Sequence, residues 1–346
     1  MSRRVCVAGT GFFSQFHFDA WSRLDVEVVG ICSLDLETAR EIARPFADCP
    51  VFDDLAEMLR QTRPDLLDIV TPPPTHLGFI ETAMAAGVTT ICQKPFCGSL
   101  DHARNAVALS QASGVPLIAH ENFRFQPWYG EIKNQIDAGT LGDVYQGTFR
   151  LRPGDGQGPD AYLDRQPYFQ QMPRLLVHET LVHLIDVFRA LFGKVVWVMA
   201  DLRKLNPVIR GEDAGIIVLG FENGQRAIID GNRLVDHVAA NRRLVMGEML
   251  IEGAGGCLRL DGDAQLFKRA HAGNDEVPLA YDWHDNGYGG DCVYRLNRHV
   301  LEALAAGRDP VNTAAAYLAN MEIVDAVYRS DAEGRRIQLG ADDPSA

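Results

Sequence analysis

The fold of this 346-residue chain is decided by the stretch Val5-Cys6-Val7-Ala8-Gly9-Thr10-Gly11-Phe12-Phe13-Ser14. A short apolar run ends in two closely spaced glycines, and residues 12–24 follow with a helical pattern, so the stretch predicts a strand, a tight turn and a helix. Such a turn leaves the N–H groups of the helix N-terminus facing the pyrophosphate of a dinucleotide. We therefore expect a dinucleotide-binding Rossmann unit, with Gly9, Gly11, Phe12 and Phe13 beside the cofactor.

Alternating strand and helix signals continue through the first third of the chain. Asp35 and Ser99 stand where helix N-caps are expected. Repeated β-α units build a parallel sheet covered by helices, which predicts a doubly wound α/β domain over residues 1–122. The predicted strands are 5–8, 26–32, 66–70, 88–92 and 116–120, and the predicted helices are 12–24, 36–45 and 99–113.

Beyond residue 122 the strand signals follow one another with few helices between them. The Asn223-Gly224 pair between two of these strands is typical of an antiparallel hairpin. We therefore expect residues 123–346 to form an α+β domain with a large, mostly antiparallel open sheet. The predicted strands are 144–152, 195–204, 215–221, 226–234, 249–252 and 257–260, and the predicted helices are 173–192, 292–306 and 313–330.

The amino-acid composition limits the kinds of partner that the protein is expected to bind. The 33 Lys and Arg residues against 46 Asp and Glu give a net charge of −13, which disfavours nucleic acid and anionic membranes as partners. The sequence has no apolar run long enough to predict a membrane-spanning helix. The seven cysteines are scattered without C-x-x-C spacing, so they predict reduced thiols, a cytoplasmic protein and no metal site.

Ser33 stands near the end of the second strand, where an acid that binds the ribose is expected. A hydroxyl can bond a ribose 2′-OH or a 2′-phosphate, so Ser33 alone leaves both NAD and NADP open. The nearby carboxylates of Asp35 and Glu37 would repel a 2′-phosphate. The sequence therefore favours NAD as the cofactor, with Ser33 and Asp35 at the ribose.

Two loops follow neighbouring strands at their carboxyl ends, the edge where ligands bind in open α/β sheets. One loop carries Thr71, Pro72, Pro73 and His76, and the other carries Gln93-Lys94-Pro95. A solvated loop lysine is the ordinary interpretation of Lys94. A lysine at this edge beside the positively charged oxidised nicotinamide is also placed to act as a base toward an alcohol.

The predicted helix 173–192 carries His178, Glu179, His183 and Asp186. His178 and His183 lie about 140° apart on an ideal α-helix, so they do not form a zinc-binding pair. Glu179 and His183 are four residues apart, and Asp186 follows three residues later, which places all three on one face. A satisfied buried histidine is the alternative, but the second carboxylate on the face favours a functional site.

Arginines flank the glycine-rich segment 154–158, among them Arg150, Arg152, Arg165 and Arg174. Guanidinium groups bind hydroxyls and carboxylates well, which makes these residues candidates for substrate binding. Solvated surface arginines are the alternative interpretation.

Four of these segments, taken in order, resemble the glucose-fructose oxidoreductase and inositol dehydrogenase (Gfo/Idh/MocA) family. The chain departs from the family pattern twice: Gln93 stands where the family has Glu, and Glu179 stands where it usually has Asp. The segments that carry the resemblance are Gly9-Thr10-Gly11-Phe12-Phe13 with His17, Thr71-Pro72-Pro73 with His76, Gln93-Lys94-Pro95, and the helix Glu179–Asp186.

The resemblance implies an NAD(P)-dependent oxidoreductase that transfers a hydride between the nicotinamide and a hydroxyl of a sugar or polyol. It implies that Lys94 transfers the proton, that His183 orients the hydroxyl, that Glu179 supports the pair, and that Gln93 faces the nicotinamide ribose. The substrate residues it suggests are Asn122, Arg124, Arg152, Arg165, Glu179 and His183.

Within the family, residues 120–128 and 152–168 are most similar to a subgroup that oxidises D-apiose. The family commonly dimerises through the open sheet of the second domain, so a homodimer or a dimer of dimers is expected. The alternative function is a non-catalytic, cofactor-binding regulator or scaffold. Relatives of that kind usually lack the lysine or the histidine, whereas this chain has both Lys94 and His183.

Overall fold

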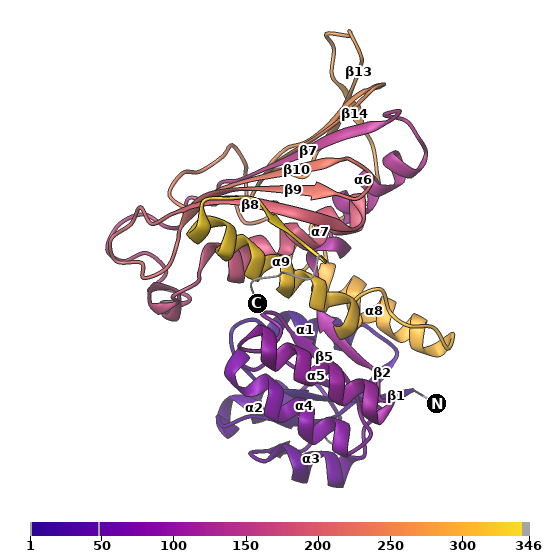
Figure 1. The fold of residues 1–346 in the computed structure, drawn as a ribbon. Helices are drawn as coiled ribbons and strands as arrows, with labels where there is room; N and C mark the ends of the chain where they lie inside the picture. Colours follow the sequence, from indigo (N-terminus) through magenta and orange to yellow (C-terminus); the bar gives the residue numbers. More distant parts are fainter. Residues whose placement is uncertain (1, 48, 341–346) are drawn as a thin grey trace. The chain divides into compact units, whose positions relative to one another are not determined.

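The computed structural model describes residues 2–47 and 49–340 (Figure 1). The chain divides into two compact units, one built from residues up to Asn122 with Asp291–Met321, the other from Phe123–Gly290 with residues from Glu322 onward. The division after Asn122 coincides with the predicted boundary. Residues 291–321, predicted in the second domain, group with the first because the backbone N–H of Ala119 bonds the Asn312 carbonyl and Ile118 pairs with Thr313.

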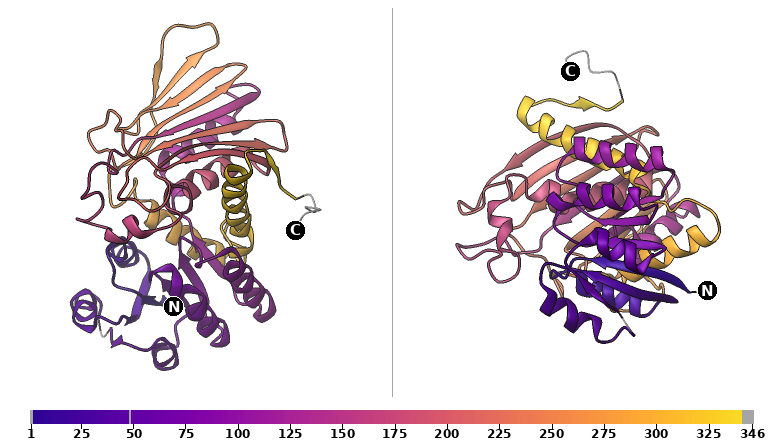
Figure 2. Two further views of the ribbon diagram at one scale, coloured as in Figure 1. Left: turned by 60° about the vertical axis from the view of Figure 1, so that its left-hand side comes forward. Right: turned by 90° about the horizontal axis from the view of Figure 1, so that it is seen from below.

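The first unit is a six-stranded parallel sheet in the order β3-β2-β1-β4-β5-β6. The order reverses between β1 and β4, which is the switch point where doubly wound sheets bind ligands. Helices lie on both faces of this sheet (Figure 2). The strands are β1 (Arg3–Ala8), β2 (Val26–Cys32), β3 (Val51–Phe52), β4 (Leu66–Ile69), β5 (Thr89–Gln93) and β6 (Leu117–His120), and the helices are α1 (Ser14–Ser22), α2 (Leu36–Ala43), α3 (Leu55–Thr62), η1 (Pro73–Thr75), α4 (His76–Ala85), α5 (Leu100–Ser113) and α8 (Cys292–Ala305).

The predicted strands and helices of this unit are confirmed, and so are two predicted caps. Asp35 accepts from the Thr38 N–H at the start of α2, and Ser99 accepts from the His102 N–H at the start of α5. The sequence prediction missed β3, α3 and α4. A two-residue strand such as β3 carries no periodic signal.

The second unit is a nine-stranded sheet in the order β14-β13-β12-β11-β7-β10-β9-β8-β15, antiparallel except where β10 pairs with β7. The predicted hairpin between β9 and β10 is confirmed, with Gly224 at φ +87° in its turn. The strands are β7 (Val144–Leu151), β8 (Val195–Arg203), β9 (Ala214–Phe221), β10 (Arg226–Asn232), β11 (Gly247–Gly253), β12 (Gly256–Leu260), β13 (Leu266–Ala270), β14 (Val277–Leu279) and β15 (Ile337–Gln338).

One face of this sheet is covered by helix and the other is open (Figures 1 and 2). On the covered face, the ring of Phe221 meets Phe192 of α7 edge to face with the ring centroids 5.3 Å apart. On the open face, Met199 and Ile216 are each 50% exposed. The helical segments of this part are η2 (Phe123–Phe125), α6 (Pro127–Asp137), η3 (Pro167–Gln171), η4 (Leu176–Leu181), α7 (Val182–Phe192) and α9 (Ala314–Glu333), of which α9 begins in the first unit.

The predicted single α-helix over residues 173–192 is wrong at its start. Residues Leu176–Leu181 form a π-helical turn, and the α-helix begins only at Val182. A π-helical turn has more residues per turn than an α-helix. The spacing of about 100° per residue therefore applies neither between His178 and His183 nor between Glu179 and His183. Such turns occur frequently at functional sites.

Candidate active site

The glycine turn after β1 has the shape that its sequence predicts. Gly9 has φ +112°, and a Cβ on it would lie 2.8 Å from the backbone carbonyl carbon and oxygen of Val70. Only glycine therefore fits at this position. A Cβ on Gly11 would meet nothing within 4 Å among the described residues, so space for a ligand lies against that backbone. This turn, open at Gly11 and placed at the start of α1, fits the pyrophosphate of a dinucleotide.

Ser33 connects this turn to the end of β2. Its hydroxyl lies 2.6 Å from the Thr10 hydroxyl and accepts from the Asp35 N–H at 3.1 Å. The carboxylate of Asp35 accepts from the Thr38 hydroxyl at 2.7 Å and from its N–H at 3.0 Å, and these bonds lower the pKa of Asp35. Asp35 is thus a helix cap that also keeps a negative charge beside Ser33, which fits NAD better than NADP.

The loop after β4 is held in place by His76. The Nε2–H of His76 donates to the Thr71 carbonyl at 2.7 Å, and the hydroxyls of Thr71 and Thr75 lie 2.7 Å apart. Burial lowers the pKa of His76 to about 4, so the ring is neutral at pH 7. His76 therefore holds the loop of Thr71, Pro72 and Pro73 in place by bonding to the backbone of that loop.

A buried chain of hydrogen bonds runs from β4 to the backbone of Lys94. The Asp68 Oδ2 atom accepts from Trp21 Nε1 at 2.7 Å and lies 2.7 Å from His17 Nδ1. His17 Nε2 is 2.9 Å from the amide nitrogen of Gln93, and the Gln93 Oε1 atom accepts from the Lys94 N–H at 2.7 Å. Burial raises the pKa of Asp68, but the contact with His17 and the two hydrogen bonds lower it by more.

The sequence analysis missed Asp68 and Trp21 in this chain. The signal for Asp68 was present, because a single carboxylate inside the apolar strand 66–70 needs a buried partner. Trp21 gave no signal, since a tryptophan on a helix is ordinarily a core residue. Lys94 itself follows β5, is half-buried, and precedes Pro95 through a cis peptide bond.

In the second unit, His183 lies on α7 and is buried. Its ring stacks flat on Phe123 of η2, with centroids 3.8 Å apart and an interplanar angle of 4°. Arg124 follows Phe123 and donates from Nε and Nη2 to the two carboxylate oxygens of Asp186, each at 2.5 Å. The stack and the bidentate ion pair together fix η2 against α7. Of the other predicted substrate residues, Asn122 in the first unit is buried.

Of the residues predicted at the substrate, Glu179 lies beside the buried guanidinium of Arg233, and Arg165 lies against Asp155, which Arg233 also binds. Arg233 donates to the two carboxylate oxygens of Asp155 at 2.8 and 3.2 Å and to the Thr180 hydroxyl at 2.5 Å. Glu179 Oε2 lies 3.9 Å from Arg233 Nη1 and accepts from the Thr180 hydroxyl at 2.7 Å, while Arg165 lies 3.5 Å from Asp155.

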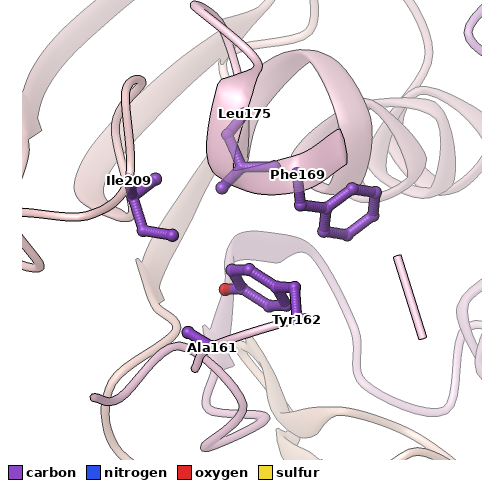
Figure 3. Close-up of a cluster of buried hydrophobic side chains, with 5 residues drawn as sticks. All are labelled: Ala161, Tyr162, Phe169, Leu175 and Ile209. Atoms are coloured by element: carbon purple, nitrogen blue, oxygen red, sulfur yellow. The ribbon is translucent and has the colours of Figure 1, made fainter. Parts of the chain in front are cut away.

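The Arg233 guanidinium also packs over two aromatic rings. Its centre lies 5.0 Å from the ring centroid of Tyr162 and 5.5 Å from that of Phe169. Both rings belong to a small buried apolar cluster with Ala161, Leu175 and Ile209, which Figure 3 shows. The loop that contains Asp155 and the π-helical turn that contains Glu179 are therefore joined through Arg233. The sequence analysis missed Arg233 and Asp155, because they lie 78 positions apart in the chain.

Arg152 makes a separate set of contacts at the end of β7. It donates to the carbonyls of Leu151 and Asp230 at 2.8 and 2.7 Å and pairs with the Asp230 carboxylate. Over the part of the chain that the structure describes, no three His, Cys, Asp or Glu side chains are grouped to hold a metal ion. Nor is any helix of that part both long and apolar enough to cross a membrane.

Comparison with known protein families matches two parts of the chain. Residues 3–120 match an oxidoreductase family with an NAD-binding Rossmann fold, and residues 129–249 match the GFO/IDH/MocA C-terminal domain. The chain belongs to the Gfo/Idh/MocA oxidoreductase family. As a member of this family it is an oxidoreductase that binds NAD, and the non-catalytic alternative receives no support.

Several Gfo/Idh/MocA proteins are similar over nearly the whole chain. The D-apiose dehydrogenase of Paraburkholderia graminis is 33% identical over 342 residues, covering 96% of this chain and 88% of that protein. The D-apiose dehydrogenase of Rhizobium rhizogenes is 29% identical, covering 96% of each. An Agrobacterium radiobacter oxidoreductase, solved with NAD⁺, L-tartaric acid and magnesium, has a TM-score of 0.88 at 26% identity and covers 99% of both chains.

Proposed function

We propose that this chain is an NAD-dependent sugar dehydrogenase whose substrate is D-apiose. The observation that carries the proposal is the full-length similarity to two D-apiose dehydrogenases, each aligned over 96% of this chain. The glycine turn at Gly9 and the Ser33–Asp35 pair support the choice of NAD.

The reaction separates the two hydrogens of a CH–OH group. The chemistry that bound NAD would supply is that of an acceptor for the carbon-bound hydrogen, which leaves as a hydride. The hydroxyl proton must leave as the C–O bond becomes a carbonyl, and a positioned base speeds this step by about 10²–10⁴-fold. We assign the base to the side-chain nitrogen of Lys94, which takes up the proton in its neutral form.

His183 is assigned to orienting the substrate hydroxyl. The flat stack on Phe123 fixes the plane of the imidazole, and therefore the directions in which its nitrogens donate and accept. Glu179 supports this arrangement from the π-helical turn, where the Thr180 hydroxyl and Arg233 hold its carboxylate. Asn122, Arg124, Arg152 and Arg165 are assigned to binding or framing the sugar.

Three further assignments accompany this function. The first unit, residues up to Asn122 with Asp291–Met321, is assigned to dinucleotide binding, and the second unit is assigned to substrate binding and dimerisation. The oligomer is a homodimer or a dimer of dimers built on the open face of the nine-stranded sheet, where Met199 and Ile216 are half-exposed. The enzyme acts in the cytoplasm.

The proposed function is tested by the absorbance of reduced nicotinamide. Purified protein is incubated with NAD or NADP and with D-apiose, other aldopentoses or myo-inositol. The proposal predicts the highest kcat/KM for D-apiose with NAD. A kcat/KM for D-apiose at or below that of the other sugars contradicts the substrate assignment, and tighter binding of NADP than of NAD contradicts the cofactor assignment.

A further inference from the structure

Gln93 stands between an ionisable ring and the backbone of the proposed base. Its Oε1 atom accepts from the Lys94 N–H at 2.7 Å, and its Nε2 atom lies 2.9 Å from His17 Nε2. Both Gln93 and His17 are buried, so water does not replace either contact. The donor and acceptor roles in this chain must therefore match atom by atom.

The Lys94 N–H fixes these roles. A backbone N–H can only donate, so the side-chain atom of Gln93 that faces it must be the carbonyl oxygen. The amide NH₂ then faces His17 and can only donate, which requires His17 Nε2 to be a bare acceptor. The remaining proton of the ring sits on Nδ1 and donates to Asp68, 2.7 Å away.

A positively charged His17 would break one of these hydrogen bonds. An imidazolium at His17 would present an N–H from Nε2 toward the Gln93 amide. Turning that amide over would satisfy the ring, but it would bring the NH₂ group against the Lys94 N–H and leave a buried donor unpaired, which is unfavourable.

We infer that Gln93 is a positioning residue that locks His17 in its neutral Nδ1–H form and ties the start of the Lys94 loop to the buried Asp68. The state of His17 does not depend on the proposed role of Lys94.

Three groups besides Gln93 bear on the ring of His17. Asp68 of β4 and Trp21 of α1 meet at one carboxylate oxygen, and the His120 ring of β6 lies with its centroid 4.2 Å from that of His17. Burial lowers the pKa of His120 to about 3, so that ring is neutral at pH 7. Asp68 accepts the Nδ1 proton in either charge state of His17, so the contact of Nε2 with the Gln93 amide decides between them.

The inference is tested by the ¹⁵N chemical shifts of His17 at about pH 7, which distinguish both neutral tautomers from the imidazolium. In the intact protein we expect one protonated nitrogen, Nδ1. Two protonated nitrogens in the wild-type protein would overturn the inference, and so would a proton on Nε2 alone.

The matched variant is Gln93→Glu, which replaces the amide by a carboxylate of the same shape. Its two oxygens would accept from both the Lys94 N–H and His17 Nε2, so we expect His17 to carry two protons in this variant at the same pH. The control Gln15→Glu adds the same charge at an exposed position of α1 and should leave the His17 shifts unchanged. A neutral His17 in folded Gln93→Glu would overturn the inference.

Kinetic measurements distinguish a failure of this inference from a failure of the proposed function. If the wild-type protein oxidises a sugar, Gln93→Glu should change the dependence of kcat on pH, because an ionisable pair then adjoins Lys94. If the wild-type protein oxidises none of the sugars, the proposed function fails while the ¹⁵N result still decides the state of His17. Should Gln93→Glu fail to fold, the wild-type spectrum alone supports or overturns the inference.

Discussion

Gly9→Ala should destabilise the first unit strongly, and the neighbouring Gly11→Ala should not. At φ +112°, an alanine occupies a conformation that L-residues rarely adopt, which costs about 1–2 kcal/mol. Its Cβ would also lie 2.8–2.9 Å from the backbone of Val70 and Thr71, and overpacking of this kind costs about 1–3 kcal/mol. Together these effects predict a loss of about 2–5 kcal/mol in the free energy of unfolding.

Gly11 provides a matched control in the same turn. Its added methyl group meets no described atom within 4 Å, so we expect a change in the free energy of unfolding within about 0.5 kcal/mol. The same methyl group would occupy the space assigned to the pyrophosphate. Gly11→Ala should therefore weaken NAD binding at least tenfold while the protein without cofactor keeps its stability.

The assays are urea unfolding followed by circular dichroism without cofactor, and calorimetric titration with NAD. The expected result is a lower unfolding midpoint for Gly9→Ala alone, together with a weaker NAD affinity for Gly11→Ala. Equal midpoints for Gly9→Ala and the wild-type protein would refute the steric argument. Unchanged NAD affinity in Gly11→Ala would refute the placement of the cofactor at this turn.

Three more perturbations follow from the structure. Arg233→Met should lower the free energy of unfolding by about 1–3 kcal/mol in urea, since Asp155 loses its bidentate partner but still lies 3.5 Å from Arg165; a loss below about 0.5 kcal/mol would show that the pair contributes little. The free energy of unfolding should fall as the pH drops from about 6.5 toward 4, because His76 takes up a proton at higher pH in the unfolded chain than in the folded chain. The urea midpoint of His76→Gln should therefore vary less than that of the wild-type protein over this interval. If the proposed assembly forms on the open sheet face, Ile216→Asp should reduce the mass measured by light scattering at micromolar concentration to that of a monomer, whereas Val238→Asp, at a more exposed valine outside the sheet, should leave the mass unchanged; a monomeric wild-type protein would contradict the assembly proposal.

Most of the fold was predictable from the sequence because its signals are local. Alternating apolar runs, the N-caps at Asp35 and Ser99, and the Asn223-Gly224 turn each act within a few residues. The π-helical turn at 176–181 was not predictable in this way, since the residues that hold it are distant in sequence. Arg233, for example, bonds Thr180 across 53 positions.

In the candidate site, too, the features with local sequence signals were predicted and the long-range contacts were not. Gly9 and the loops after β4 and β5 were identified because strand ends of a parallel sheet meet at one edge. The partners that set the state of each side chain were missed: Asp68 for His17, Phe123 for His183, and Asp155 with Arg233 for Glu179. These pairs form only when distant segments of the chain pack together, so the hydrophobic periodicity of the sequence does not indicate them.

The most direct test of the account is the kinetics of Lys94→Ala with D-apiose and NAD. Loss of the proposed base should reduce kcat by about 10²–10⁴-fold, equivalent to about 2.7–5.5 kcal/mol, while calorimetry shows NAD binding within a few-fold of the wild-type protein. Lys94→Met, which keeps the aliphatic length of the side chain, should lose as much activity. A near-normal kcat with a raised KM would contradict the account, because Lys94 would then bind the substrate without transferring its proton.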